Sequence, residues 1–320
     1  MRADLRVLAR DTVAALAAAS GLTAPRRRHR GRLVVVTFHR VLPRALRDRY
    51  PYPNLAVTPD ELGWLLSTLA KDYTLGPLSE LHARHASGEH PARPFMAVTF
   101  DDGQRDNFEH ARPVLVRSGV RASFFVPVDA IDRAEPLWHD RLGFAALALG
   151  HTDPLALASA AKRRSPAERD ALVRRTVERA GAPVPAWAGM MSWAEVRTLA
   201  REGHEIGSHS MSHALLPQCD ERALRDEVGR SRSRIEGEIG APVASFCYPN
   251  GDWDRRAADA VRAAGYRRAV GTRWGSNPPG APALALRRCD VDSRRLRDRR
   301  GACSAALLSL RLSALDPRAA

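Results

Sequence analysis

The stretch Phe-Met-Ala-Val-Thr-Phe-Asp-Asp-Gly, from Phe95 to Gly103, constrains the fold more than any other part of the chain. A run of strand-forming residues ends abruptly in two adjacent carboxylates, Asp101 and Asp102, and a glycine. A buried strand of an α/β fold shows this pattern when it delivers acidic groups to a cleft at its carboxyl end. The alternative is a turn or a helix cap with solvated acids.

A second motif, Gly207-Ser-His-Ser-Met-Ser-His213, decides between these interpretations. It follows a short strand-like segment and places His209 and His213 four residues apart, so both imidazoles can point at one ion. One aspartate and two neutral imidazoles are three protein ligands, which leave a position on a divalent ion open, as catalytic sites do. Zinc would lower the pKa of a bound water to about 7, and the other carboxylate would accept its proton.

Two further residues of interest follow predicted strands. Residues 32–39 form a continuous apolar strand that ends in His39, and residues 243–248 form one that ends in Tyr248. A single histidine at such a place is usually structural, but its position predicts that it faces the same cleft. We therefore expect His39 to supply the acid for the leaving group, and a backbone N–H near Tyr248 to stabilise the oxyanion.

Strands and helices alternate along most of the chain. Besides the strand before Asp101, strands are predicted at residues 32–39, 121–127, 204–207, 243–248, 266–270 and 285–291. About seven strands alternating with helices predict a parallel α/β barrel. The chain has no Gly-x-Ser-x-Gly, no phosphate loop and no Gly-x-Gly-x-x-Gly at a strand–helix junction, which argues against serine hydrolases, NTPases and dinucleotide enzymes.

The helix-like, alanine-rich residues 129–187 interrupt this alternation. We interpret them as an insertion in one domain of residues 31–300. Within it, Trp138-His-Asp140 could line the cleft, although aromatic packing is the simpler interpretation. Residues 1–30 are predicted to be an amphipathic helix with a basic linker, and residues 301–320 a C-terminal tail.

The predicted N-terminal helix has one apolar and one basic face. Leu5, Leu8, Val13 and Leu16 fall near one side, opposite Arg2, Arg6 and Arg10. Such a helix either touches a membrane surface or docks on the domain, and the sequence leaves both open. Acidic residues interrupt this segment and no run of ~18 apolar residues follows, so we expect a cytoplasmic protein, peripheral to the membrane at most.

The chain carries 50 basic and 36 acidic side chains, a net charge of +14. This excess suggests an anionic neighbour such as membrane headgroups, nucleic acid or a charged glycan, but a general bias towards arginine explains most of it. We expect no nucleic acid among these neighbours. The four cysteines form no Cys-x-x-Cys pair and are expected to be free thiols.

Thr99-Phe-Asp-Asp-Gly103 with His209-Ser-x-x-His213 resembles the polysaccharide deacetylase family, the NodB-homology enzymes of carbohydrate esterase family 4. The resemblance covers residues 33–291. It implies a distorted (β/α)7 barrel, Asp101 as the base, and Asp102, His209 and His213 as ligands of one divalent ion. That ion would be zinc, with cobalt, nickel and iron as alternatives.

The chain departs from the usual family pattern at two places. Ser245-Phe-Cys-Tyr-Pro249 stands where an arginine-containing motif is usual, and no late Leu-x-His is evident. The chain instead resembles the branch that includes biofilm poly-N-acetylglucosamine deacetylases, whose acid histidine comes from the first strand, as His39 does. Arg288 resembles the arginine that orients the base in that branch, with Arg287 beside it as the alternative.

The expected function is metal-dependent hydrolysis of N-acetyl groups from an amino-sugar polysaccharide or glycan precursor, a reaction at a carbon–nitrogen bond other than a peptide bond. Two alternatives are weighed against it. The same metal site could deacylate a small amide or another acylated precursor, or the chain could be a non-catalytic glycan-binding relative.

Overall fold

The strands form a closed barrel. The computed structural model describes residues 2–313 and 315. Its strands are β1 (Leu33–Phe38), β2 (Arg40–Val41), β3 (Ala56–Val57), β4 (Thr74–Gly76), β5 (Phe95–Phe100), β6 (Ser123–Val126), β7 (Glu205–Ser208), β8 (Ser245–Cys247), β9 (Arg268–Trp274) and β10 (Leu286–Asp290). β1 pairs with β10 on one side and in full register with β5 on the other, so the series β10-β9-β8-β7-β6-β5 returns to β1. The predicted seven-stranded parallel α/β barrel is confirmed.

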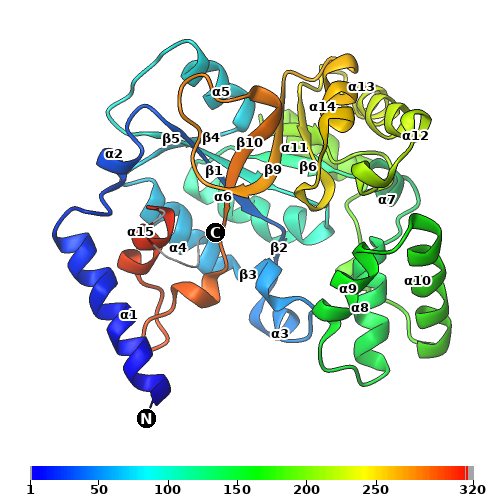
Figure 1. Ribbon diagram of the computed structural model, residues 1–320, viewed down its shortest axis with the longest axis horizontal. Helices are drawn as coiled ribbons and strands as arrows, with labels where there is room; N and C mark the ends of the chain where they lie inside the picture. The colour runs from blue at the N-terminus through cyan, green and yellow to red at the C-terminus, as the bar shows by residue number, and fades with distance from the viewer. Residues whose placement is uncertain (1, 314, 316–320) are drawn as a thin grey trace.

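Helices connect most of these strands (Figure 1). They are α1 (Arg2–Ala19), α2 (Pro25–Arg28), α3 (Arg44–Arg47), α4 (Pro59–Leu69), α5 (Leu78–Ala86), α6 (Arg112–Ser118), α7 (Val128–Asp132), α8 (Trp138–Ala148), α9 (Pro154–Lys162), α10 (Pro166–Ala180), α11 (Trp193–Arg201), α12 (Glu221–Arg225), α13 (Ser231–Ile239), α14 (Arg255–Ala263) and α15 (Ala305–Leu312). β4 and α5 were not predicted from the sequence. Among the described helices, none is long and apolar enough to cross a bilayer.

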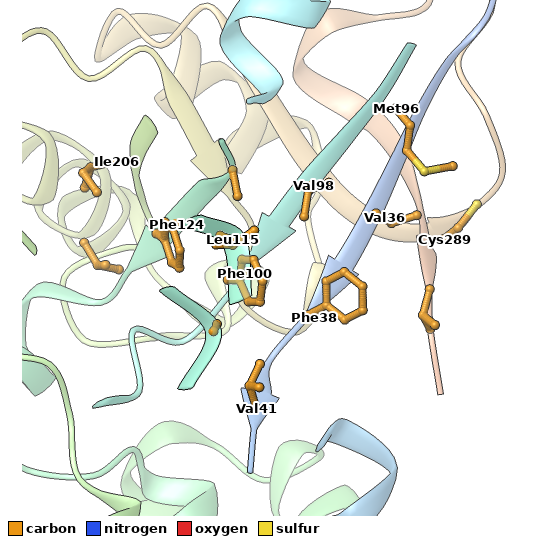
Figure 2. Packing of buried hydrophobic residues seen from close by; sticks show 14 of the residues in the cluster. Val36, Phe38, Val41, Met96, Val98, Phe100, Leu115, Phe124, Ile206 and Cys289 are labelled. Atoms are coloured by element: carbon orange, nitrogen blue, oxygen red, sulfur yellow. The ribbon is translucent and has the colours of Figure 1, made fainter. Parts of the chain in front are cut away.

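Side chains alternate between the inside and the outside of the barrel, because successive residues of a strand point to opposite faces. Leu33 and Val35 of β1 join an inner cluster with Phe95 and Ala97 of β5. The intervening residues join the larger cluster between strands and helices. In that outer cluster Phe38, Phe100 and Phe124 stack in a row, with ring centroids 5.4 and 5.0 Å apart (Figure 2). The same alternation continues past the strand ends, which directs His39 and Asp101 inward.

A buried ion pair fastens α8 to the barrel. Arg40, directly after His39, is fully buried and donates to Asp106 at 2.8 Å and to Asp140 of α8 at 2.7 Å. Tyr50 donates its hydroxyl to the second oxygen of Asp140 at 2.7 Å. Residues 129–187 contain helices and no strand among their elements, and α8–α10 form one edge of the molecule (green in Figure 1).

The C-terminal segment is part of the packed structure. Within residues 301–320, which we expected to be a tail, α15 places Leu307, Leu308 and Leu312 in the main hydrophobic cluster. α15 packs beside α1, and Ala14 of α1 belongs to the same cluster. The segment therefore belongs to the core as far as residue 312.

We predict that Asp140→Ala lowers the free energy of unfolding by roughly 3–5 kcal/mol, because it leaves the Arg40 charge buried without one of its two carboxylate partners. Denaturant unfolding followed by circular dichroism measures this. Asp48→Ala is the matched control, since the Arg44–Asp48 pair is exposed on α3 and should contribute less than about 1 kcal/mol. Equal effects of the two substitutions would contradict the prediction.

Candidate metal centre

The predicted site residues meet at the carboxyl ends of the strands. Asp101 and Asp102 follow β5, and His209 follows β7. Asp102 has a positive φ of 72°, which is unusual for a residue with a side chain. This turn separates the two adjacent carboxylates, so that each meets different partners.

Asp102, His209 and His213 form one compact group of buried ligand atoms. The Nε2 atoms of both histidines lie 3.3 Å from the same oxygen, Oδ1 of Asp102. Tetrahedral ligands bound at about 2.1 Å to a zinc ion lie about 3.4 Å from one another, so the group fits one divalent ion.

Hydrogen bonding also prepares His209 as a ligand. Its Nδ1 lies 2.7 Å from the carbonyl oxygen of Cys247. Because a carbonyl oxygen only accepts, Nδ1 carries the proton and Nε2 keeps its lone pair towards Asp102. The Nδ1 atom of His213 has no hydrogen-bond partner in the described part of the chain.

Asp101, His209 and Cys247 form a second group of potential ligands. This group is less suited to an ion. Burial raises the pKa of the Cys247 thiol, which keeps it protonated, and the proton on Nδ1 of His209 already faces the Cys247 carbonyl. Asp101 is committed to another partner.

That partner is Arg288, not Arg287. Two nitrogens of the Arg288 guanidinium lie 2.8 Å from the two oxygens of Asp101, and both side chains are buried. Burial alone raises the pKa of Asp101, but the charge and hydrogen bonds of Arg288 outweigh it and hold that pKa below its ordinary value. Asp101 is therefore an ionised, oriented carboxylate beside the ligand group.

His39 and Tyr248 also face the cavity. Nε2 of His39 lies 3.9 Å from Oδ2 of Asp101, and a quarter of its side chain is exposed. The N–H of Tyr248 itself donates to the carbonyl of Val270 at 3.1 Å, and its hydroxyl donates to the carbonyl of Leu284 at 3.0 Å. An oxyanion donor from this segment stays a prediction. Pro249 has no N–H, so the next backbone N–H is that of Asn250, which also lines the cavity.

The cavity has a volume of about 280 Å³, and one of its walls comes from residues 129–187. Trp138 and His139 of α8 line it, while Asp140 points into the ion pair with Arg40, so aromatic packing alone was the wrong interpretation of this motif. Nε2 of His139 lies 3.8 Å from Oδ2 of Asp102. Lys162 of α9, which we did not single out, lines the cavity too and donates to the side-chain oxygen of Asn250.

Backbone strain is concentrated around this cavity. Among the described residues other than glycine, those with positive φ are Asp102, Ala134, Ser210, His213 and Asn250, and all but Ala134 belong to the cavity-forming segments. Each such residue costs on the order of 1–3 kcal/mol and persists only where its surroundings enforce it. Asp, His and Asn adopt this conformation more readily than other residues with side chains, so three of the four positions carry residue types suited to it.

We predict that His209→Ala and His213→Ala each weaken binding of a divalent ion by more than the roughly 10–100-fold that loss of an outer-shell partner costs. Titration with zinc, followed by elemental analysis of the dialysed protein, measures this. His151→Ala, at an exposed histidine, is the control. Unchanged metal content in both ligand variants would reject the site.

Three solved structures share this fold. Deacetylase PplD of Streptococcus pyogenes superposes with a TM-score of 0.62 at 15% identity, over 87% of this chain and 96% of that one. IcaB of Ammonifex degensii gives 0.58 at 21% identity, over 81% and 91%, and the BpsB deacetylase domain of Bordetella bronchiseptica gives 0.55 at 18% identity, over 82% and 96%. At these identities the likeness shows the fold.

No curated protein matches the sequence. The polysaccharide deacetylase family model matches residues 88–269, more than half of the chain, and spans both motifs from which the site is built. The chain belongs to the polysaccharide deacetylase family.

Proposed function

We propose that this protein hydrolyses N-acetyl groups from an amino-sugar polysaccharide or glycan precursor, with a divalent ion at Asp102, His209 and His213. One observation carries the proposal: the ligand group lies beside an ionised carboxylate, Asp101, that a buried arginine holds in place, inside an open cavity. A ligand site alone would serve binding, whereas a ligand site with an adjacent oriented base serves hydrolysis.

The roles of the residues follow from their positions. A divalent ion held by Asp102, His209 and His213 would supply Lewis acidity, which makes water more acidic and polarises a carbonyl. Asp101 accepts the proton of the attacking water, and Arg288 is a positioning residue that keeps this carboxylate ionised and fixed. His39, whose Nε2 lies 3.9 Å from Asp101, donates a proton to the leaving amine. The C–N bond breaks as acetate and a free amine form.

The structural neighbours support this chemistry. The PplD structure is described as a complex with acetate, the product that N-acetyl hydrolysis releases. The BpsB structure is that of a deacetylase domain. Two imidazoles and one carboxylate suit zinc, and they also suit cobalt, nickel or ferrous iron, so we propose zinc with these ions as alternatives.

The direct test is acetate release from oligomers of N-acetylglucosamine, with the monomer as a small-amide comparison, in the presence of added zinc, cobalt or nickel. We expect Asp101→Asn to keep the metal and to lose turnover by roughly 10²–10⁴-fold, because an amide cannot act as the base. Release of acetate from the monomer alone would favour the small-amide alternative. Joint loss of metal and turnover in Asp101→Asn would make Asp101 a ligand.

His39→Ala tests the acid. We expect metal content and KM to stay near the parent values while kcat falls by roughly 10²–10⁴-fold, since the leaving amine then lacks its proton donor. Near-normal turnover in this variant would assign proton donation to water or to another group.

A further inference from the structure

One side of helix α1 contacts the domain through Arg10, Asp11 and two alanines. Arg10 donates to Asp11 at 2.7 Å and to the carbonyl of Arg297 at 2.6 Å, and Asp11 accepts the N–H of Arg299 at 2.8 Å. On the same side, Ala14 and Ala17 are buried. The helix is thus attached through polar contacts and small side chains.

The opposite side of α1 is apolar and faces solvent. Leu8, Thr12 and Leu16 lie one turn apart along it, with Val13 beside them. The exposed fractions are 41% for Leu8, 56% for Val13 and 65% for Leu16. Arg2 and Leu5, which we assigned to the two faces, have side chains outside the described part of the chain. Leu8, Val13 and Leu16 of the predicted apolar face therefore point outward, and Arg6 of the predicted basic face is exposed as well.

Exposed apolar side chains gather here more than elsewhere. In the described part of the chain the large ones are Leu8, Val13, Leu16, Leu22, Val116, Leu147, Leu155, Trp253 and Leu315. The first four belong to α1 and the turn that follows it, and Leu315 follows α15, which packs beside α1. The others are distributed over α6, α8, α9 and the loop after β8. α1 itself lies at the outer edge of the molecule (blue in Figure 1).

Cationic side chains border this face at both ends. Leu8 lines a shallow groove together with Arg299 and Arg300. At the other end, Leu22 is followed by the exposed Arg26 and Arg27 of α2, of which Arg26 lies 3.7 Å from Asp72. Asp298, the carboxylate in the groove, accepts hydrogen bonds from the backbone N–H groups of Arg300 and Ala302.

We propose that the exposed apolar surface of α1 and of the turn after it, formed by Leu8, Val13, Leu16 and Leu22, docks on an anionic lipid bilayer surface. An outward apolar helix face bordered by arginines is the arrangement with which interfacial helices enter the headgroup region. A second copy of the chain is a poorer occupant, because both copies carry a net charge of +14 and would repel. The sequence left docking on the domain and membrane contact as alternatives. In this proposal one side of α1 packs on the domain while the opposite side contacts the bilayer.

The test is sedimentation of the full chain with vesicles of phosphatidylcholine alone and of phosphatidylcholine with phosphatidylglycerol. We expect binding to the anionic vesicles to exceed binding to the neutral ones by about tenfold or more, since two arginines near the surface suffice for this difference. The difference should shrink at high salt. The double variant Leu8→Asp/Leu16→Asp should lose at least about tenfold of the anionic binding.

The control is Val116→Asp/Leu147→Asp, which makes the same changes at exposed apolar residues on α6 and α8. It should bind vesicles with only the small loss expected from two added negative charges. Acetate release from a soluble oligomer should be unchanged in both double variants, which separates this inference from the proposed function. Equal vesicle binding by the two double variants, or a dimer in solution that the α1 variant dissociates, would overturn the proposal.

Discussion

Asp101 and Asp102 are two adjacent carboxylates at the end of one strand, and they are only 2% and 4% exposed. Two like charges in such a place must each find a separate cationic partner, because an unpaired buried charge is far costlier than a paired one. The left-handed backbone at Asp102 makes this separation geometrically achievable. One carboxylate meets Arg288 of β10, two strands away, and the other is left for two imidazoles and the ion that they fit.

This pairing makes the site depend on closure of the barrel. Asp101 belongs to the segment after β5, whereas Arg288 comes from β10, which reaches β5 only through β1. Thr37 of β1 lies between them and accepts from Arg288 at 3.0 Å. Asp101 is therefore held only when the first and the last strands of the chain have both joined the sheet, while the candidate ligand group needs only β5 and β7.

Much of this could be predicted from the sequence, because strand alternation and strand ends determine where a side chain points. Asp101, Asp102, His209 and His39 were predicted in this way to face one cleft. All four line the same cavity of the closed barrel. Arg288 could not be separated from Arg287 without the register of β10, since neighbouring residues on a strand face opposite sides. β4 has three residues, too few to show a pattern. For α1 the sequence predicts two faces but not which one the domain covers.

The insertion, residues 129–187, is bonded to the segment that carries His39. Asn107 donates to the carbonyl of His39 at 2.7 Å, and the next residue along the chain, Arg40, is held by Asp106 and by Asp140 of α8. The helix that presents Trp138 and His139 to the cavity is therefore bonded to the residue that follows His39. Because the Arg40–Asp140 pair is fully buried, a shift of α8 would expose or unpair a charge, which opposes independent motion of the two. The cavity wall that α8 provides and the placement of His39 are for this reason coupled through Arg40.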